Sequence, residues 1–206
     1  MTEAEWLESN DPAAMGAAIT KRRRGSARVL RLFVAAFWHW QSFRLKGAAE
    51  QKRLRNRAAL VAQWAESGTE PEGTETGYAF VGFNRRPRQA FLTTVRAPGQ
   101  WSTSGNPAVK RAVWLLHEVF GNPFALRRKR KADPVRGNMF DPSWRTDTAI
   151  ALARQMYEAN DFSAMPILAD ALQDAGCTNE DLLAHCREPH EHVRGCWAVD
   201  LVLARE

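Results

Sequence analysis

The chain has 206 residues, of which 45% are hydrophobic and 25% are charged, and its net charge is +6. These are ordinary globular values, so they exclude a wholly disordered chain, and the length allows one sizeable core or two small ones. The run that comes nearest to a membrane span, residues 30–38, is short and contains an arginine. The acidic opening lacks a secretion signal and only three cysteines follow, which predicts a cytoplasmic protein without membrane contact or structural disulfides.

The charge is unevenly divided along the chain. Residues 21–136 contain 24 Lys or Arg against 7 Asp or Glu, a net charge of +17, and the remaining residues carry −11. A division of this size predicts either an anionic partner or an internal pairing of the two parts.

The first part of the chain carries four helix signals in succession. Thr2 with Glu5 predicts a capping box, Asp11 before a proline predicts a second helix that stops before Lys21, and Ser26 is expected to cap a third. In the third helix one apolar face is predicted, made of Val29, Leu30, Phe33, Ala36, Phe37, Trp40 and Phe43. A fourth helix fits Ala48 to Glu66.

The middle of the chain is less regular. Residues 67–104 include an acidic, turn-rich loop, a short run at 78–83 that suits a strand or a helix start, and a possible helix over 88–95. Asn106 before a proline predicts a further helix that ends at Gly121. The basic connection 122–142, with three prolines, is long enough to be functional or mobile.

The last part reads as a compact set of helices. Thr146 opens the first, Gly176 is expected to end the second in the left-handed conformation, and Thr178 is expected to cap a third that ends at Arg187. A final helix is predicted over His192 to Ala204. The predicted fold class is therefore all-α, a helical bundle or stacked helical hairpins with a less regular middle segment.

For the domain organisation we predict a single globular unit. A possible sub-division has a basic N-terminal helical part, 1–121, the basic connection, 122–142, and a compact C-terminal helical bundle, 143–206.

All three cysteines and three of the five histidines fall within residues 177–197. Zinc binds three or four Cys or His ligands, often as two chelating pairs, and the candidate ligands here are Cys186, His190, His192 and Cys196. The single residue between the two histidines makes a cramped bridge between these pairs. Cysteines of a buried core explain the same pattern, so no cofactor is expected, with zinc as the alternative.

A thiol-dependent enzyme is a further alternative. Cys196, His192 and Asp200 would share one face of the predicted final helix, whereas His185 and Cys186 are consecutive and point apart. No oxyanion-hole, phosphate-loop or other catalytic motif accompanies them. The sequence therefore favours a protein without catalytic residues.

Three basic runs are candidates for binding an anion or a nucleic acid. They consist of Lys21, Arg22, Arg23 and Arg24, then Arg85, Arg86 and Arg88, then Arg127, Arg128, Lys129, Arg130 and Lys131. Nearby aromatic residues, Phe80, Phe83 and Trp101, are candidates for stacking on bases. Solvated loops, or pairing with the acidic C-terminal part, would explain the same runs.

Several segments resemble a family of bacterial proteins that is abundant in planctomycetes and has no established activity. They are residues 1–7, 30–33, 120–124, 165–172, 174–177, 185–187 and 192–197, which include the MTEAEWL start and the HVRGCW segment. The resemblance implies a bacterial, cytoplasmic, predominantly helical protein. Members of that family carry a cysteine-rich stretch after the LRLF segment, but here VAAFWH follows, which lowers the expectation of a zinc site.

Taken together, these patterns predict a non-catalytic binding or adaptor module. Its basic central segment would contact an acidic protein surface or a nucleic-acid backbone. Binding to nucleic acid would not depend on its sequence.

Overall fold

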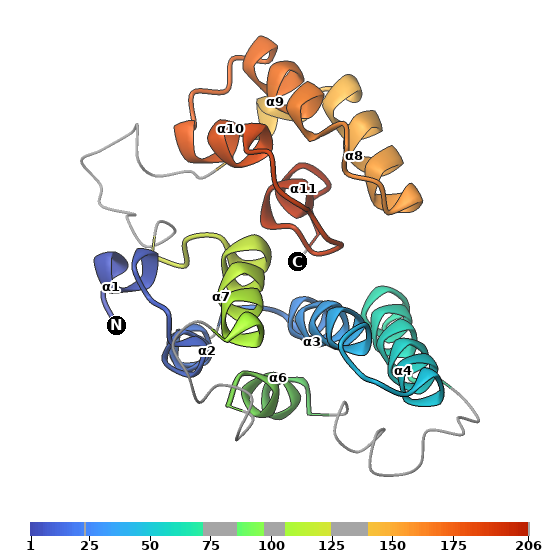
Figure 1. Ribbon diagram of the computed structural model, residues 1–206. Helices are drawn as coiled ribbons and strands as arrows, with labels where there is room; N and C mark the ends of the chain where they lie inside the picture. The colour runs from blue at the N-terminus through green and yellow to red at the C-terminus, as the bar shows by residue number, and fades with distance from the viewer. Residues whose placement is uncertain (23, 72–85, 97–105, 125–139, 206) are drawn as a thin grey trace. The chain divides into compact units, whose positions relative to one another are not determined.

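The structure is a computed structural model that describes residues 1–22, 24–71, 86–96, 106–124 and 140–205. Within these ranges it contains ten α-helices, one short 3₁₀ helix and no strand, which confirms the all-α prediction (Figure 1). No helix in the described ranges combines the length and the apolar character needed to cross a membrane. The chain divides into two compact units, Met1–Phe120 and Gly121–Arg205. That they make a single globular unit stays a prediction.

The described residues of the N-terminal unit form six helices. These are α1 (Glu3–Leu7), α2 (Pro12–Lys21), α3 (Ala27–Ser42), α4 (Ala48–Ser67), α6 (Pro87–Arg96) and α7 (Pro107–Phe120). The predicted caps are present: Thr2 and Glu5 form the capping box, and Asp11 and Ser26 accept backbone N–H bonds at the starts of α2 and α3. Because these caps satisfy donors that a helix leaves unpaired, the local sequence decides where the helices begin.

The core of the N-terminal unit forms where α3 packs against α4, α6 and α7. The rings of Phe33 and Phe91 meet edge to face at 5.0 Å, and Phe91 meets Phe120 at 5.5 Å. On the other side of α3, Arg28 pairs with Glu66 of α4 at 3.3 Å. Helix α3 is thus buried on more than one face, and this pairing fixes its position between its neighbours.

The predicted apolar face of α3 is wrong at its last member. The helix ends at Ser42, and Phe43, its C-cap, has a side chain that is 62% exposed. Three residues outside the predicted face, Leu32, Val34 and Ala35, are buried as well, because α4 covers a second face of the helix.

In the C-terminal unit, the residues that the structure describes form four α-helices. They are α8 (Asp147–Ala159), α9 (Met165–Asp174), α10 (Glu180–Arg187) and α11 (Trp197–Val202), preceded by the 3₁₀ helix η2 (Pro142–Trp144). They enclose a core of their own around Met165, Leu168 and Leu172. The side chain of Arg145 donates to the backbone carbonyls of Leu201 and Val202, at 2.9 to 3.2 Å, and so ties the start of this unit to its end.

Two predictions for this unit need correction. The cap of α10 is Asn179, which accepts from the N–H of Leu182, and not Thr178. The last helix begins at Trp197 and not at His192, because the backbone of residues 193–196 forms a turn in which Gly195 has a φ of +92°. The segment 188–196 therefore has no helical structure, which matters for its histidines.

Candidate functional site

The basic runs predicted from the sequence lie partly within the described residues. Lys21 is the last residue of α2 and Arg22 is its C-cap, while Arg86 precedes α6 and Arg88 lies in its first turn. Lys21, Arg86 and Arg88 are exposed. Arg24 is partly buried, and its N–H donates to the carbonyl of Ile19 at 3.0 Å. The remaining predicted residues lie outside the described residues, as do Phe80, Phe83 and Trp101: they are Arg23, Arg85, Arg127, Arg128, Lys129, Arg130 and Lys131.

A pocket in the N-terminal unit brings the second basic run next to the chain that follows the first. It has a volume of about 390 Å³. Its lining residues are Gly25, Ser26, Ala27, Leu30, Arg86, Pro87 and Arg88. The chain that follows the first basic run thus lies opposite the second run, and among the described residues the lining contains two arginines and no carboxylate. We call this the basic pocket.

Two helices begin at the basic pocket. Ser26 is the N-cap of α3 and Pro87 is the first residue of α6, and both line the pocket. The N-terminus of a helix carries a partial positive charge and is favourable for anions. Among the described residues neither Arg86 nor Arg88 has a carboxylate partner, so their charges add to those of the helix ends. The arrangement suits a phosphate or another anion.

Gly25 shapes the entrance to α3. Its φ is +80°, a conformation that side chains rarely adopt, and a Cβ there would lie 2.7 Å from Cε1 of Phe120. Only glycine allows the chain to turn here without strain, so the pocket depends on this residue.

A second cationic surface, which was not predicted from the sequence, lies at the C-terminal end of α3. The guanidinium of Arg55 lies 5.5 Å from the ring of Phe43, and that of Arg44 lies 5.1 Å from the ring of Trp40. His39 meets Phe43 edge to face at 5.1 Å. We call these five residues the aromatic patch. An exposed aromatic ring beside arginines is a platform on which a base can stack.

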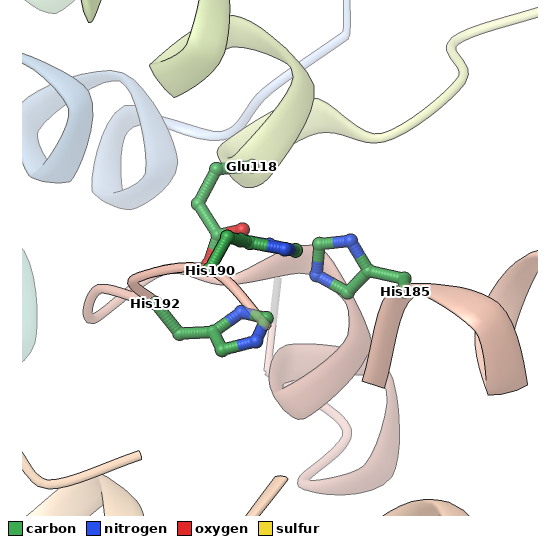
Figure 2. A group of neighbouring side chains, drawn as sticks. All are labelled: Glu118, His185, His190 and His192. Atoms are coloured by element: carbon green, nitrogen blue, oxygen red, sulfur yellow. The ribbon is translucent and has the colours of Figure 1, made fainter. Parts of the chain in front are cut away.

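The histidines of the C-terminal unit come together although they stand on different segments (Figure 2). His185 belongs to α10, while His190 and His192 lie in the non-helical segment before α11. One nitrogen of each of these three side chains lies within 4.8 Å of those of the other two. The ring centroids of His190 and His192 are 4.2 Å apart, and that of His185 is 5.2 and 5.1 Å from them. Figure 2 also labels Glu118, a residue of the N-terminal unit.

Cys196, the N-cap of α11, contacts two of the three histidines. Its Sγ is 3.2 Å from Nε2 of His185 and 3.9 Å from Nδ1 of His192. Cys196 is fully buried and His192 is 9% exposed, so the sulfur faces the rings and not solvent. We call His185, His190, His192 and Cys196 the His/Cys cluster.

Local hydrogen bonds hold the segment that carries this cluster. The N–H of Cys196 donates to the carbonyl of Val193 at 2.9 Å, which closes the turn. The side chain of Arg194 donates to the carbonyls of Tyr157 and Glu158, at 3.1 and 3.0 Å, and so fastens the turn to the end of α8. The turn before Cys196 is therefore held both by its own backbone and by α8.

From α10, His185 joins the cluster, whereas Cys186 was the residue predicted from the sequence. Cys186 is fully buried and belongs to the hydrophobic core of the unit. His185 and Cys186 do point apart, as predicted, but His185 meets Cys196 eleven residues further on. No spacing rule reveals this contact, because it depends on the turn at residues 193–196.

Cys177, the remaining cysteine, is also a core residue. Burial raises the pKa of its thiol, against the lowering effect of a hydrogen bond from the backbone of Asn179. A thiol of this kind is chemically inert. The alternative of a catalytic Cys196 with His192 and Asp200 has little geometric support, because Cys196 is fully buried and Asp200 is 6% exposed.

Comparison with known proteins gives no family, curated protein or solved structure that matches this chain. The function is therefore argued from the sites themselves.

Proposed function

We propose that the protein is a non-catalytic module that binds the phosphate backbone of nucleic acid through its N-terminal unit. The observation that carries the proposal is the basic pocket, in which Arg86 and Arg88 meet the starts of α3 and α6 and no described lining residue is a carboxylate. Phosphate oxygens accept hydrogen bonds both from arginines and from the N–H groups at helix starts.

The aromatic patch favours nucleic acid over an acidic protein surface. Phe43 is 62% exposed beside Arg44 and Arg55, which suits stacking on an unpaired base. Both contact points belong to or adjoin α3, and its rise of about 1.5 Å per residue sets Ala27 and Phe43 about 24 Å apart along the helix. Backbone contacts at one end and stacking at the other would favour single strands, read without sequence specificity.

The test is a titration of fluorescently labelled single- and double-stranded oligonucleotides with the full chain, followed by anisotropy at several salt concentrations. We expect binding that weakens with salt, with a slope of about 0.7 to 0.9 in log K for each phosphate contact. Arg88→Ala should weaken binding to every sequence and lower that slope by about one contact. Phe43→Ala should weaken binding to single strands more than to double strands.

The matched control is Arg154→Ala, which removes one exposed positive charge from α8 in the C-terminal unit. It should leave the affinity and the slope nearly unchanged. Equal losses in Arg88→Ala and Arg154→Ala would show that only net charge matters and would overturn the role of the basic pocket. Absence of binding at low salt would overturn the nucleic-acid proposal and leave an acidic protein as the partner to seek.

A further inference from the structure

We propose that the His/Cys cluster is a zinc site, in which His185, His190, His192 and Cys196 supply four ligands. The inference goes beyond the proposed function and does not depend on it, since all four residues belong to the C-terminal unit.

The donor atoms are already close to the geometry that zinc requires. Zinc–sulfur bonds of about 2.3 Å and zinc–nitrogen bonds of about 2.0 to 2.1 Å in a tetrahedron set sulfur and nitrogen about 3.5 Å apart. The two sulfur–nitrogen distances from Cys196, 3.2 Å to His185 and 3.9 Å to His192, lie on either side of this value. One nitrogen of each histidine lies within 4.8 Å of those of the other two, and zinc binding would draw these three atoms closer together.

The cluster is difficult to explain as ordinary packing. Three imidazole rings lie with their centroids 4.2 to 5.2 Å apart. One nitrogen of each lies within 4.8 Å of those of the other two, and nitrogens of His185 and His192 lie 3.2 and 3.9 Å from the sulfur of Cys196. A divalent cation at the centre would convert this arrangement into four bonds.

Two further observations fit a metal site. Nδ1 of His190 lies 3.4 Å from Oε2 of Glu188, which matches the carboxylate that often orients a zinc-bound histidine through its other nitrogen. The side chain of His190 is also 23% exposed, so solvent reaches the cluster at this ligand.

The donor set points to zinc among the divalent ions. Imidazole and thiolate together suit zinc better than magnesium or calcium, which prefer oxygen ligands. Binding would displace the proton of the Cys196 thiol to solvent, and the histidines would bind as neutral rings. Four protein ligands close the coordination shell, so the ion would act structurally and fix segment 188–196 between α10 and α11.

The experiment uses the full chain, freed of metal with a chelator and then titrated with zinc in a calorimeter. One zinc ion should bind per chain, and cobalt should give d–d bands together with a thiolate-to-metal charge-transfer band in the ultraviolet. His185→Gln and Cys196→Ala should each weaken zinc binding by at least about tenfold. Their controls, His117→Gln in α7 and Cys177→Ala in the C-terminal core, should bind zinc as the unaltered chain does.

A variant that fails to fold is recognised by circular dichroism, and Glu188→Gln then takes its place. The side chain of Glu188 is 70% exposed, so this change spares the core and should still lower zinc affinity by about tenfold. A folded chain that binds no zinc would overturn the proposal, as would equal losses in the control variants. Cobalt binding without the charge-transfer band would overturn the assignment of Cys196 as a ligand.

Discussion

The two units of this chain build their sites in different ways. In the N-terminal unit, exposed arginines stand at the start of α6, beside the start of α3 that Ser26 marks in the sequence. In the C-terminal unit, the histidines and Cys196 meet because a turn with no helical structure folds back between two helices. A site at helix ends can be foreseen from caps and charges, whereas a site on a turn depends on tertiary structure.

The strongest way to test this contrast is to damage the N-terminal core alone. Phe91 is fully buried between Phe33 and Phe120 in the helix that forms one wall of the basic pocket. Phe91→Ala should cost about 3 to 5 kcal/mol of unfolding free energy, because it leaves a cavity, and should weaken nucleic-acid binding. Urea unfolding and the anisotropy titration measure the two effects.

Zinc binding should survive in the same variant, because the His/Cys cluster has its own core around Leu168. Loss of zinc binding in folded Phe91→Ala would show that the two sites are not independent.

A smaller effect is expected from two glycines that share a left-handed backbone but differ in surroundings. Gly25→Ala meets both a φ of +80° and a contact of 2.7 Å with Phe120, and should cost about 1 to 3 kcal/mol. Gly68→Ala has a φ of +70° with nothing within 4 Å of the added Cβ, and should cost about 1 kcal/mol. Thermal unfolding measures both, and equal costs would mean that the contact with Phe120 relaxes freely.

The smallest effect concerns His117, which contacts Trp6 edge to face at 5.3 Å in α7. Burial lowers the pKa of His117 below its usual 6.5, so the unfolded chain binds the proton more readily than the folded one. Stability should therefore be complete above about pH 6.5 and fall as the pH drops through the interval below it. In His117→Gln the loss between pH 7 and pH 5 should be smaller than in the unaltered chain. Identical pH profiles in urea unfolding would contradict this assignment.

Much of the helical framework follows from local signals. Thr2, Asp11, Ser26, Thr146 and Gly176 mark helix ends correctly, because a cap or a left-handed residue acts within its own turn. The exposure of Phe43 could not be read in this way, since it depends on where α3 stops and on the second face that α4 covers.

The candidate sites differ in the same way, since one follows from local signals and the other from tertiary structure. Arg86 and Arg88 were predicted as anion contacts, and the structure adds the pocket that brings them to the start of α3. His185 could not be assigned from its neighbours, because its contact with Cys196 arises only when residues 193–196 turn. Periodicity predicted that His192 and Cys196 share a helical face, and they are neighbours for a different reason.

The bonds from Arg145 to the carbonyls of Leu201 and Val202 have a consequence for evolution and engineering. They bring the beginning and the end of the helical array α8–α11 to one place, as in many domains that tolerate insertion into other proteins. A module with adjacent ends can be placed inside a surface loop of a host protein, or re-threaded with new ends, without separating its helices. The C-terminal unit thus has the topology of a domain that can be inserted into other proteins.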